Sequence, residues 1–182
     1  KVLSRKNSVS YNPIAYGINH IKKQYYKFYQ YPIDNIKIGT TIGTNALLER
    51  KGNKVLLVLT KGFKDNFIIG TQQRNKIFER HFLRQKKIYS EVMEVNERIS
   101  SEGKVIVKLD ENKAYKSLKN LFNRGIQSIG IILLNGFNFP NHEKIIKDIA
   151  IKIGFKNISC SHQVSPTINF TSRGFTTLVD AY

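Results

Sequence analysis

Cysteine, tryptophan and long apolar runs are scarce or absent in this sequence. Tryptophan does not occur and Cys160 is the single cysteine, which excludes a disulfide framework and a zinc site built from several thiolates. No apolar run approaches the ~18 residues that a membrane-spanning helix needs. Residues 1–11 have no apolar core of the kind found in a secretion signal. These absences favour a reducing, cytoplasmic setting and no membrane partner.

Acidic residues are the other scarce class. The chain has 13 aspartates and glutamates against 30 lysines and arginines, so its formal net charge is +17. Such an excess can neutralise the phosphates of a nucleic acid. Here, however, lysine, isoleucine and asparagine are abundant together, as in a genome rich in A and T, and basic residues are spread from Lys1 to Arg173. We therefore interpret the charge as that of a solvated surface and expect no nucleic-acid partner.

The apolar residues that are present suffice for one domain. The 182 residues are 41% hydrophobic, which argues against disorder and allows a single core. Continuous apolar runs predict buried strands at Lys54–Thr60 and Ser128–Phe137, and alternation over 91–110 predicts an antiparallel hairpin. Helical patterns lie between these segments. The sequence therefore predicts an α/β fold, in which a mixed sheet centred on the two buried strands has helices on both faces.

Capping residues and glycines mark the expected helix boundaries. Asn12-Pro13 predicts a helix start, and Asp110 predicts the N-cap of a helix closed by Gly125. Another helix is expected at 141–153, ahead of Gly154. The remaining expected elements are strands at 36–38 and 157–161, a short helix within 62–69, an excursion over 71–89 and a helix that begins at 173. Because this last helix is unfinished at residue 182, we expect a domain that is incomplete at both ends.

The run from Gly39 to Asn45 crowds glycines and threonines between an expected strand and an expected helix. Glycine lets a backbone approach a ligand closely, and threonine hydroxyls with the free amides of a helix start can bind a phosphate or another oxyanion. The spacing matches no P-loop and no dinucleotide fingerprint. Alternatively, the threonines only cap the helix and satisfy a tight turn. The residues alone leave both interpretations open.

Six collinear motifs give the sequence a resemblance to a known family. They are GTTIGTNALLERKG (39–52), LVLTKGFKD (57–65), EVNERIS (94–100), PNHE (140–143), SHQVSP (161–166) and an ending with Arg173, Thr176, Thr177, Ala181 and Tyr182. In order and spacing they are similar to the hydantoinase A / 5-oxoprolinase family, and the similarity extends over the whole chain.

The resemblance implies the N-terminal part of an actin-like (ribonuclease H-like) ATPase domain. Members of the family use ATP to open or activate a cyclic amide, as 5-oxoprolinase and N-methylhydantoinase do, and acetone carboxylase subunits are relatives. The implied enzyme uses ATP and Mg²⁺, and its partners are a small cyclic amide, the remaining hydantoinase A domain and a hydantoinase B-type subunit. The family's phosphate-binding hairpin is expected before residue 1, and its hydantoinase A domain after residue 182. We therefore expect residues 1–182 by themselves to be inactive and to hold no nucleotide.

The resemblance assigns a substrate- or phosphate-binding role to a set of small, polar and basic residues: Gly39, Thr40, Thr41, Thr44, Asn45 and Arg74. It assigns no catalytic residue. Ile38 stands where the family has histidine, and 170–172 lack the glutamates that the family tends to carry, so the activity stays open. The alternative is a catalytically inactive remnant or a basic binding or structural domain.

Other polar residues have structural interpretations. Glu97 and Arg98 are adjacent in an expected strand and so face opposite sides, which favours structural ion pairs with separate neighbours. His142 and Glu143 begin a helix, where capping and the helix dipole account for them. No histidine has a partner at metal-ligand spacing, so no metal site is expected within the chain. Cys160 is expected to be buried and unreactive.

Overall fold

Four parallel strands form the central sheet, in the order β2 (Glu91–Val95), β1 (Val55–Thr60), β5 (Ser128–Ile132) and β6 (Asn157–Cys160). The computed structural model describes residues 12–24, 35, 37, 39–70 and 87–182. Val58 lies in register with Met93 on one side and with Ile131 on the other. The two strands with continuous apolar runs are therefore central, as predicted.

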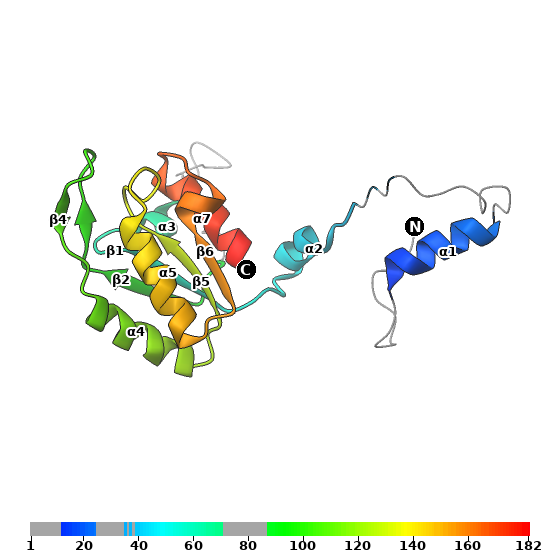
Figure 1. Ribbon diagram of the computed structural model, residues 1–182, viewed down its shortest axis with the longest axis horizontal. Helices are drawn as coiled ribbons and strands as arrows, with labels where there is room; N and C mark the ends of the chain where they lie inside the picture. Colours follow the sequence, from blue (N-terminus) through cyan, green and yellow to red (C-terminus); the bar gives the residue numbers. More distant parts are fainter. Residues whose placement is uncertain (1–11, 25–34, 36, 38, 71–86) are drawn as a thin grey trace, which may run out of the picture. The chain divides into compact units, whose positions relative to one another are not determined.

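Helices cover both faces of this sheet (Figure 1). One face packs against α4 (Glu111–Asn123) and α5 (Asn141–Ile153), and the other against α3 (Asn66–Ile69) and α7 (Phe170–Ala181). The prediction of helices on both faces is confirmed. Over the described residues, no helix is both long and apolar enough to cross a bilayer.

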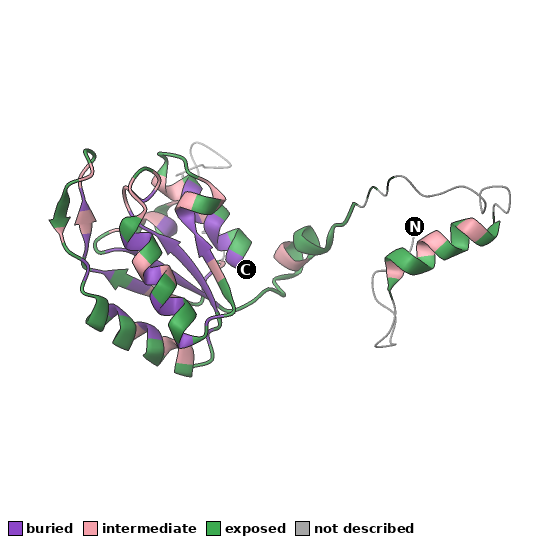
Figure 2. Cartoon of the chain, viewed as in Figure 1, coloured by how far each residue is buried: buried purple, intermediate pink, exposed green. Residues whose placement is uncertain are grey.

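Alternate residues of β1 point into two different cores. Leu56 and Val58 pack with α4 and α5, whereas Val55, Leu57 and Leu59 pack with α3 and α7. None of these five residues has any exposed surface, and Figure 2 shows the same concentration of burial along the central strands. A strand covered on both faces needs apolar side chains at every position, which explains its uninterrupted apolar sequence.

Predicted caps form at three helix ends. The Asn12 side chain accepts hydrogen bonds from the amides of Ile14 (3.0 Å) and Ala15 (3.1 Å) at the start of α1 (Pro13–Gln24). Asp110 accepts one from the Lys113 amide at 2.9 Å. Gly154 ends α5 in the left-handed conformation, with φ of 108°, which glycine adopts without a steric penalty.

The predicted hairpin over 91–110 is wrong in its first half. Strand β2 pairs in parallel with β1, and the antiparallel pair is a separate two-stranded sheet of β3 (Arg98–Ile99) and β4 (Val105–Val107). The chain turns at Asn96, where the Glu97 amide donates to the Val95 carbonyl at 3.1 Å. Inward-facing residues continue at every second position across this turn, so the alternation could not reveal it. Among the described strands, the central sheet is parallel and not mixed.

Several shorter elements complete the chain. The motif at 39–52 contains α2 (Ile42–Glu49), and β6 leads directly into α6 (Ser161–Val164), which the sequence did not predict. The short helix expected within 62–69 is α3. The strand expected at 36–38 and most of the excursion at 71–89 lie outside the described residues. The chain divides into two compact units, 1–41 and 42–182; α1 belongs to the first and every other described element to the second.

The packing of α5 gives a stability prediction with a matched control. Ile146 has no exposed surface and lies in the core shared with α4, whereas Ile151 of the same helix is 55% exposed. We expect Ile146→Ala to lower the free energy of unfolding by about 2–5 kcal/mol and Ile151→Ala to change it by less than about 0.5 kcal/mol. Urea denaturation measures both. Equal losses would show that α5 does not pack on the sheet through this face.

Candidate functional site

The carboxyl ends of β1 and β5 lie at the point where the chain connections change sides. After β1 the chain passes through α3 to reach β2, whereas after β5 it passes through α5, on the opposite face, to reach β6. Adjacent parallel strands whose connections leave toward opposite faces create a crevice beyond their carboxyl ends, where α/β proteins bind ligands. The polar residues at this edge are therefore the first candidates for a site.

Glu97 joins three elements at this edge. Its carboxylate accepts a hydrogen bond from the Thr60 hydroxyl at the end of β1 and lies 2.7 Å from Nδ1 of His142 on α5. The Thr60 oxygen in turn accepts from the amide of Leu134, beyond β5, at 3.0 Å. Glu97, Thr60 and His142 are all buried. Arg98 has a different neighbour, the Phe63 ring at 5.2 Å. The predicted separate neighbours of Glu97 and Arg98 are confirmed, but within the described residues Arg98 contacts a ring and not the ion-pair partner that was expected.

Glu143 forms a second cluster and has no exposed surface. It accepts hydrogen bonds from the Leu133 amide (2.9 Å), the Ser161 hydroxyl (2.6 Å) and the His162 amide (3.1 Å), and it lies 2.6 Å from His162 Nδ1. The capping interpretation of this residue is wrong, because the carboxylate turns away from its own helix to bind the segments that follow β5 and β6.

Arg173 of α7 closes the same edge from the other face. Its guanidinium is fully buried and donates to the carbonyls of Leu133 (2.8 Å) and Leu134 (2.9 Å) and to the Ser161 hydroxyl (3.0 Å). It also lies 5.3 Å from the Phe137 ring. Burial lowers the pKa of Arg173, and the nearby Glu143 carboxylate opposes this shift because it favours the charged guanidinium.

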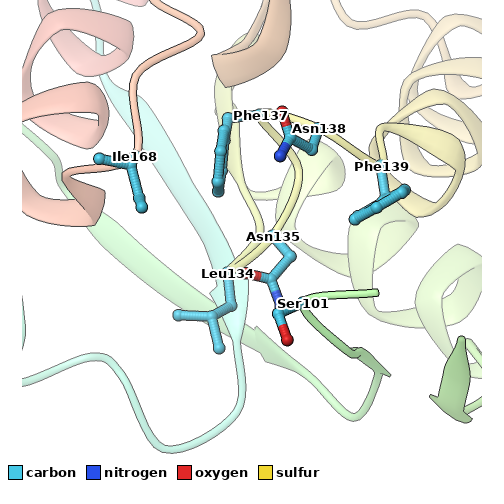
Figure 3. A pocket seen from close by; sticks show the side chains of 7 residues that line it. All are labelled: Ser101, Leu134, Asn135, Phe137, Asn138, Phe139 and Ile168. Atoms are coloured by element: carbon cyan, nitrogen blue, oxygen red, sulfur yellow. The ribbon is translucent and has the colours of Figure 1, made fainter. Parts of the chain in front are cut away.

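These clusters hold a pocket of about 470 Å³ beyond the end of β5 (Figure 3). Its described lining consists of Ser101, Leu134, Asn135, Phe137, Asn138, Phe139 and Ile168. The volume lies in the range of small-molecule sites. Four of the seven side chains are apolar, and none is charged. The apolar run over 128–137 predicts one strand, but only 128–132 is strand; this prediction is wrong in its second half, and no sequence pattern indicates the pocket that the following residues line.

The residues that the sequence proposed as a site lie elsewhere. Gly39, Thr40, Thr41, Thr44 and Asn45 are all exposed. The boundary between the two compact units falls inside this motif, after Thr41. Ile38 and Arg74 lie outside the described residues, so the roles considered for them stay predictions.

Among the described residues, no group of three histidine, cysteine or carboxylate side chains could hold a metal ion. Glu97 with His142 and Glu143 with His162 are separate pairs. Cys160 is a free, buried thiol. Burial, together with the nearby Glu143 carboxylate, raises its pKa to about 12, so it is not a thiolate nucleophile near neutral pH.

Comparison with known proteins identifies the family to which this chain belongs. The hydantoinase/oxoprolinase N-terminal region matches residues 1–154. The chain belongs to this family. The 5-oxoprolinase of Dictyostelium discoideum is 40% identical over 177 residues, which cover 84% of this chain and 14% of that protein. The 5-oxoprolinase 1 of Arabidopsis thaliana is 37% identical and covers 81% of the chain and 13% of its own length.

Other hydantoinase/oxoprolinase relatives extend the comparison. The acetophenone carboxylase gamma subunit of Aromatoleum aromaticum is 33% identical, over 82% of this chain and 23% of the subunit. The chain thus spans only a small part of each of these relatives. In the crystal structure of ATP-dependent caprolactamase from Pseudomonas jessenii, a similar fold has a TM-score of 0.76 at 23% identity and covers 93% of this chain and 26% of that one. Nucleotide-free acetone carboxylase gives a TM-score of 0.66 at 21% identity, over 77% and 22% of the two chains.

The buried guanidinium gives a second prediction. Arg173→Met should lower the free energy of unfolding by about 3–5 kcal/mol. It removes the Arg173 donors of the Leu133 and Leu134 carbonyls, leaving Leu133 with the Gly136 amide alone, and it takes the positive charge away from the buried Glu143. The control is Arg124→Met, which removes a 2.7 Å pair with Glu91 whose side chains are 56% and 38% exposed. Such surface pairs contribute at most about 1 kcal/mol. Chemical denaturation of both variants compares them, and similar losses would contradict the closing role assigned to Arg173.

Proposed function

We propose that this chain is the N-terminal part of an ATP-dependent cyclic amide hydrolase of the 5-oxoprolinase or N-methylhydantoinase type. Its family membership, with relatives named 5-oxoprolinase at 40% and 37% identity, supports this activity. In this proposal the domain is of the actin-like ATPase type and works in the cytoplasm. A hydantoinase A domain and a hydantoinase B-type subunit supply the rest of the enzyme.

The observation that carries the site is the open space at two glycines of the motif. A Cβ at Gly39 or Gly43 would meet no atom within 4 Å, and neither residue has a positive φ. Neither crowding by the described residues nor backbone strain therefore requires glycine there. Gly43 is the second residue of α2, and glycine is a poorer helix former than alanine, by up to about 1 kcal/mol in a helix interior. Glycines that the described fold does not need, beside exposed Thr41 and Thr44, support a ligand that approaches the backbone.

The motif at Gly39–Asn45 offers hydrogen-bond donors and no charged side chain. Its threonine hydroxyls and exposed backbone amides fit the oxygens of a phosphate or the oxygen of an amide that gains negative charge as its bond opens. ATP, when bound, supplies the energy for that opening. Mg²⁺ prefers carboxylate oxygens and water, and the described residues offer no such cluster, so we assign its ligands to other parts of the enzyme. A carboxylating activity is the second candidate, and only the similarity to the acetophenone carboxylase subunit favours it.

Removal of one hydroxyl tests the proposed role. In the intact enzyme, Thr41→Ala should lower kcat for cyclic-amide-dependent ATP hydrolysis by on the order of a hundredfold, because a donor aimed at developing charge contributes about 2.7–4 kcal/mol. Thr41→Ser keeps the hydroxyl and should retain most of the activity. Unchanged turnover in Thr41→Ala, with a loss of about 1 kcal/mol in stability, would instead identify a helix cap. No turnover of any cyclic amide by the wild type would favour the inactive remnant.

A glycine substitution separates the site from the fold more sharply. Gly43→Ala should leave the free energy of unfolding unchanged or raise it by up to about 1 kcal/mol, since alanine is the better helix former and the space is open. It should nevertheless lower kcat/KM at least tenfold, because the added methyl group stands where the ligand approaches. Thermal denaturation and steady-state kinetics on the same preparation measure the two effects. Normal kinetics in a stabilised protein would remove the argument for a ligand at this glycine.

A further inference from the structure

The pocket beyond β5 has rigid walls. The amide of Leu134 donates to the Thr60 hydroxyl and its carbonyl accepts from Arg173. The Phe137 ring lies against the Arg173 guanidinium. The Phe139 ring occupies the space that a Cβ at Gly103 would take, so the turn between β3 and β4 packs closely on it. Leu134, Phe137 and Phe139 are therefore held in place, which lowers the entropic cost of binding a small ligand against them; Asn138 and Ile168, at the open side, are exposed.

The lining chemistry selects an uncharged ligand with one polar edge. Phe137, Phe139, Leu134 and Ile168 provide apolar surfaces, and the described lining has no charged side chain. An ionic group placed against these apolar surfaces would lose part of its hydration and gain no charged partner from the lining. The pocket therefore fits the flat, uncharged part of a small molecule.

Two asparagines provide the polar complement. Within the described part of the chain, the side-chain amide of Asn138 has no hydrogen-bond partner, and Asn135 uses one N–H to bind the Ile99 carbonyl at 2.7 Å. A carboxamide offers an acceptor and two donors on adjacent atoms. It can therefore pair twice with a group that presents a donor and an acceptor side by side.

We propose that this pocket binds the amide edge of a small lactam-like ring, with Asn138 pairing to its N–H and C=O and the two phenylalanines contacting its faces. In a small ring the amide is held cis, so its N–H and C=O lie on the same side. An open-chain secondary amide is trans, so these two groups point in opposite directions and cannot meet one carboxamide together. The proposal rests on the proposed function and adds where the chain recognises the ring and why it prefers a cyclic amide. If the substrate ring also carries a carboxylate, the seven lining residues offer it no charged partner, so we place its contacts outside the pocket.

Saturation-transfer NMR on the intact protein tests this pairing with two probes, 2-pyrrolidinone and N-methylacetamide. The cyclic probe should bind saturably and at least about fivefold more tightly than the open-chain probe. Asn138→Asp keeps the side-chain size and removes the donors, and it should weaken lactam binding about tenfold, the equivalent of one lost hydrogen bond. Asn123→Asp makes the same charge change at an exposed asparagine outside the pocket and should bind like the wild type.

A second variant, which fills the pocket with a larger side chain, tests the proposal without changing Asn138. Ile168 is 79% exposed, so Ile168→Trp should be tolerated by the fold while its ring occupies the pocket and abolishes lactam binding. Equal binding of the lactam by the wild type and by both pocket variants would overturn the proposal, as would equal binding of the two probes. The proposed function fails by a different result, in which the intact protein consumes no cyclic amide and no ATP. If both pocket variants consume a lactam normally, the binding role proposed for this pocket is refuted and the proposed function is not.

Discussion

The carboxyl edge of the sheet depends on the bonding of two consecutive peptide groups, those of Leu133 and Leu134. All four of their backbone polar atoms are bound by side chains: the amides by Glu143 and Thr60, and both carbonyls by Arg173. Each partner comes from a different element of the fold. Because buried backbone groups must find partners, these three side chains substitute for a continued strand pairing, and β5 ends at Ile132 although the sequence stays apolar.

The same bonding creates the candidate site. Once Leu133 and Leu134 are held by side chains, the following residues are free to turn, and this turn presents Asn135, Phe137, Asn138 and Phe139 beside the crevice between β1 and β5. Charged residues behind the turn provide rigidity without entering the pocket lining. The pocket can therefore be uncharged within a chain whose formal net charge is +17. The overall charge is a property of the surface and says nothing about the ligand.

The sequence predicted most of the fold because its signals are local. Caps at Asn12 and Asp110, the glycine after α5 and the apolar runs of the two central strands each depend on a few neighbouring residues. The strand pairing of 91–95 and the end of β5 depend on residues far along the chain, and no pattern within one segment reveals them. The buried clusters around Glu97 and Glu143 were not predicted for the same reason. Polar residues just beyond several strand ends were the available signal, since parallel strands bring their carboxyl ends to one edge.

Two groups of glycines among the described residues differ in their surroundings, and the difference bears on where a ligand binds. At Gly52, Gly136 and Gly174 an added Cβ would overlap the ring of Tyr182, the carboxylate of Glu143 and the ring of Phe67, respectively. Close packing accounts for these three positions, and alanine there would require those side chains to move. At Gly39 and Gly43 the surroundings are empty, so packing within the described residues gives no reason for glycine. Glycine that lowers helix stability and fills no packing need among the described residues supports our proposal that a ligand approaches this backbone. In our proposals the two surfaces differ in how they would meet a ligand: the motif at Gly39–Asn45 by close backbone approach, and the pocket beyond β5 by an uncharged lining.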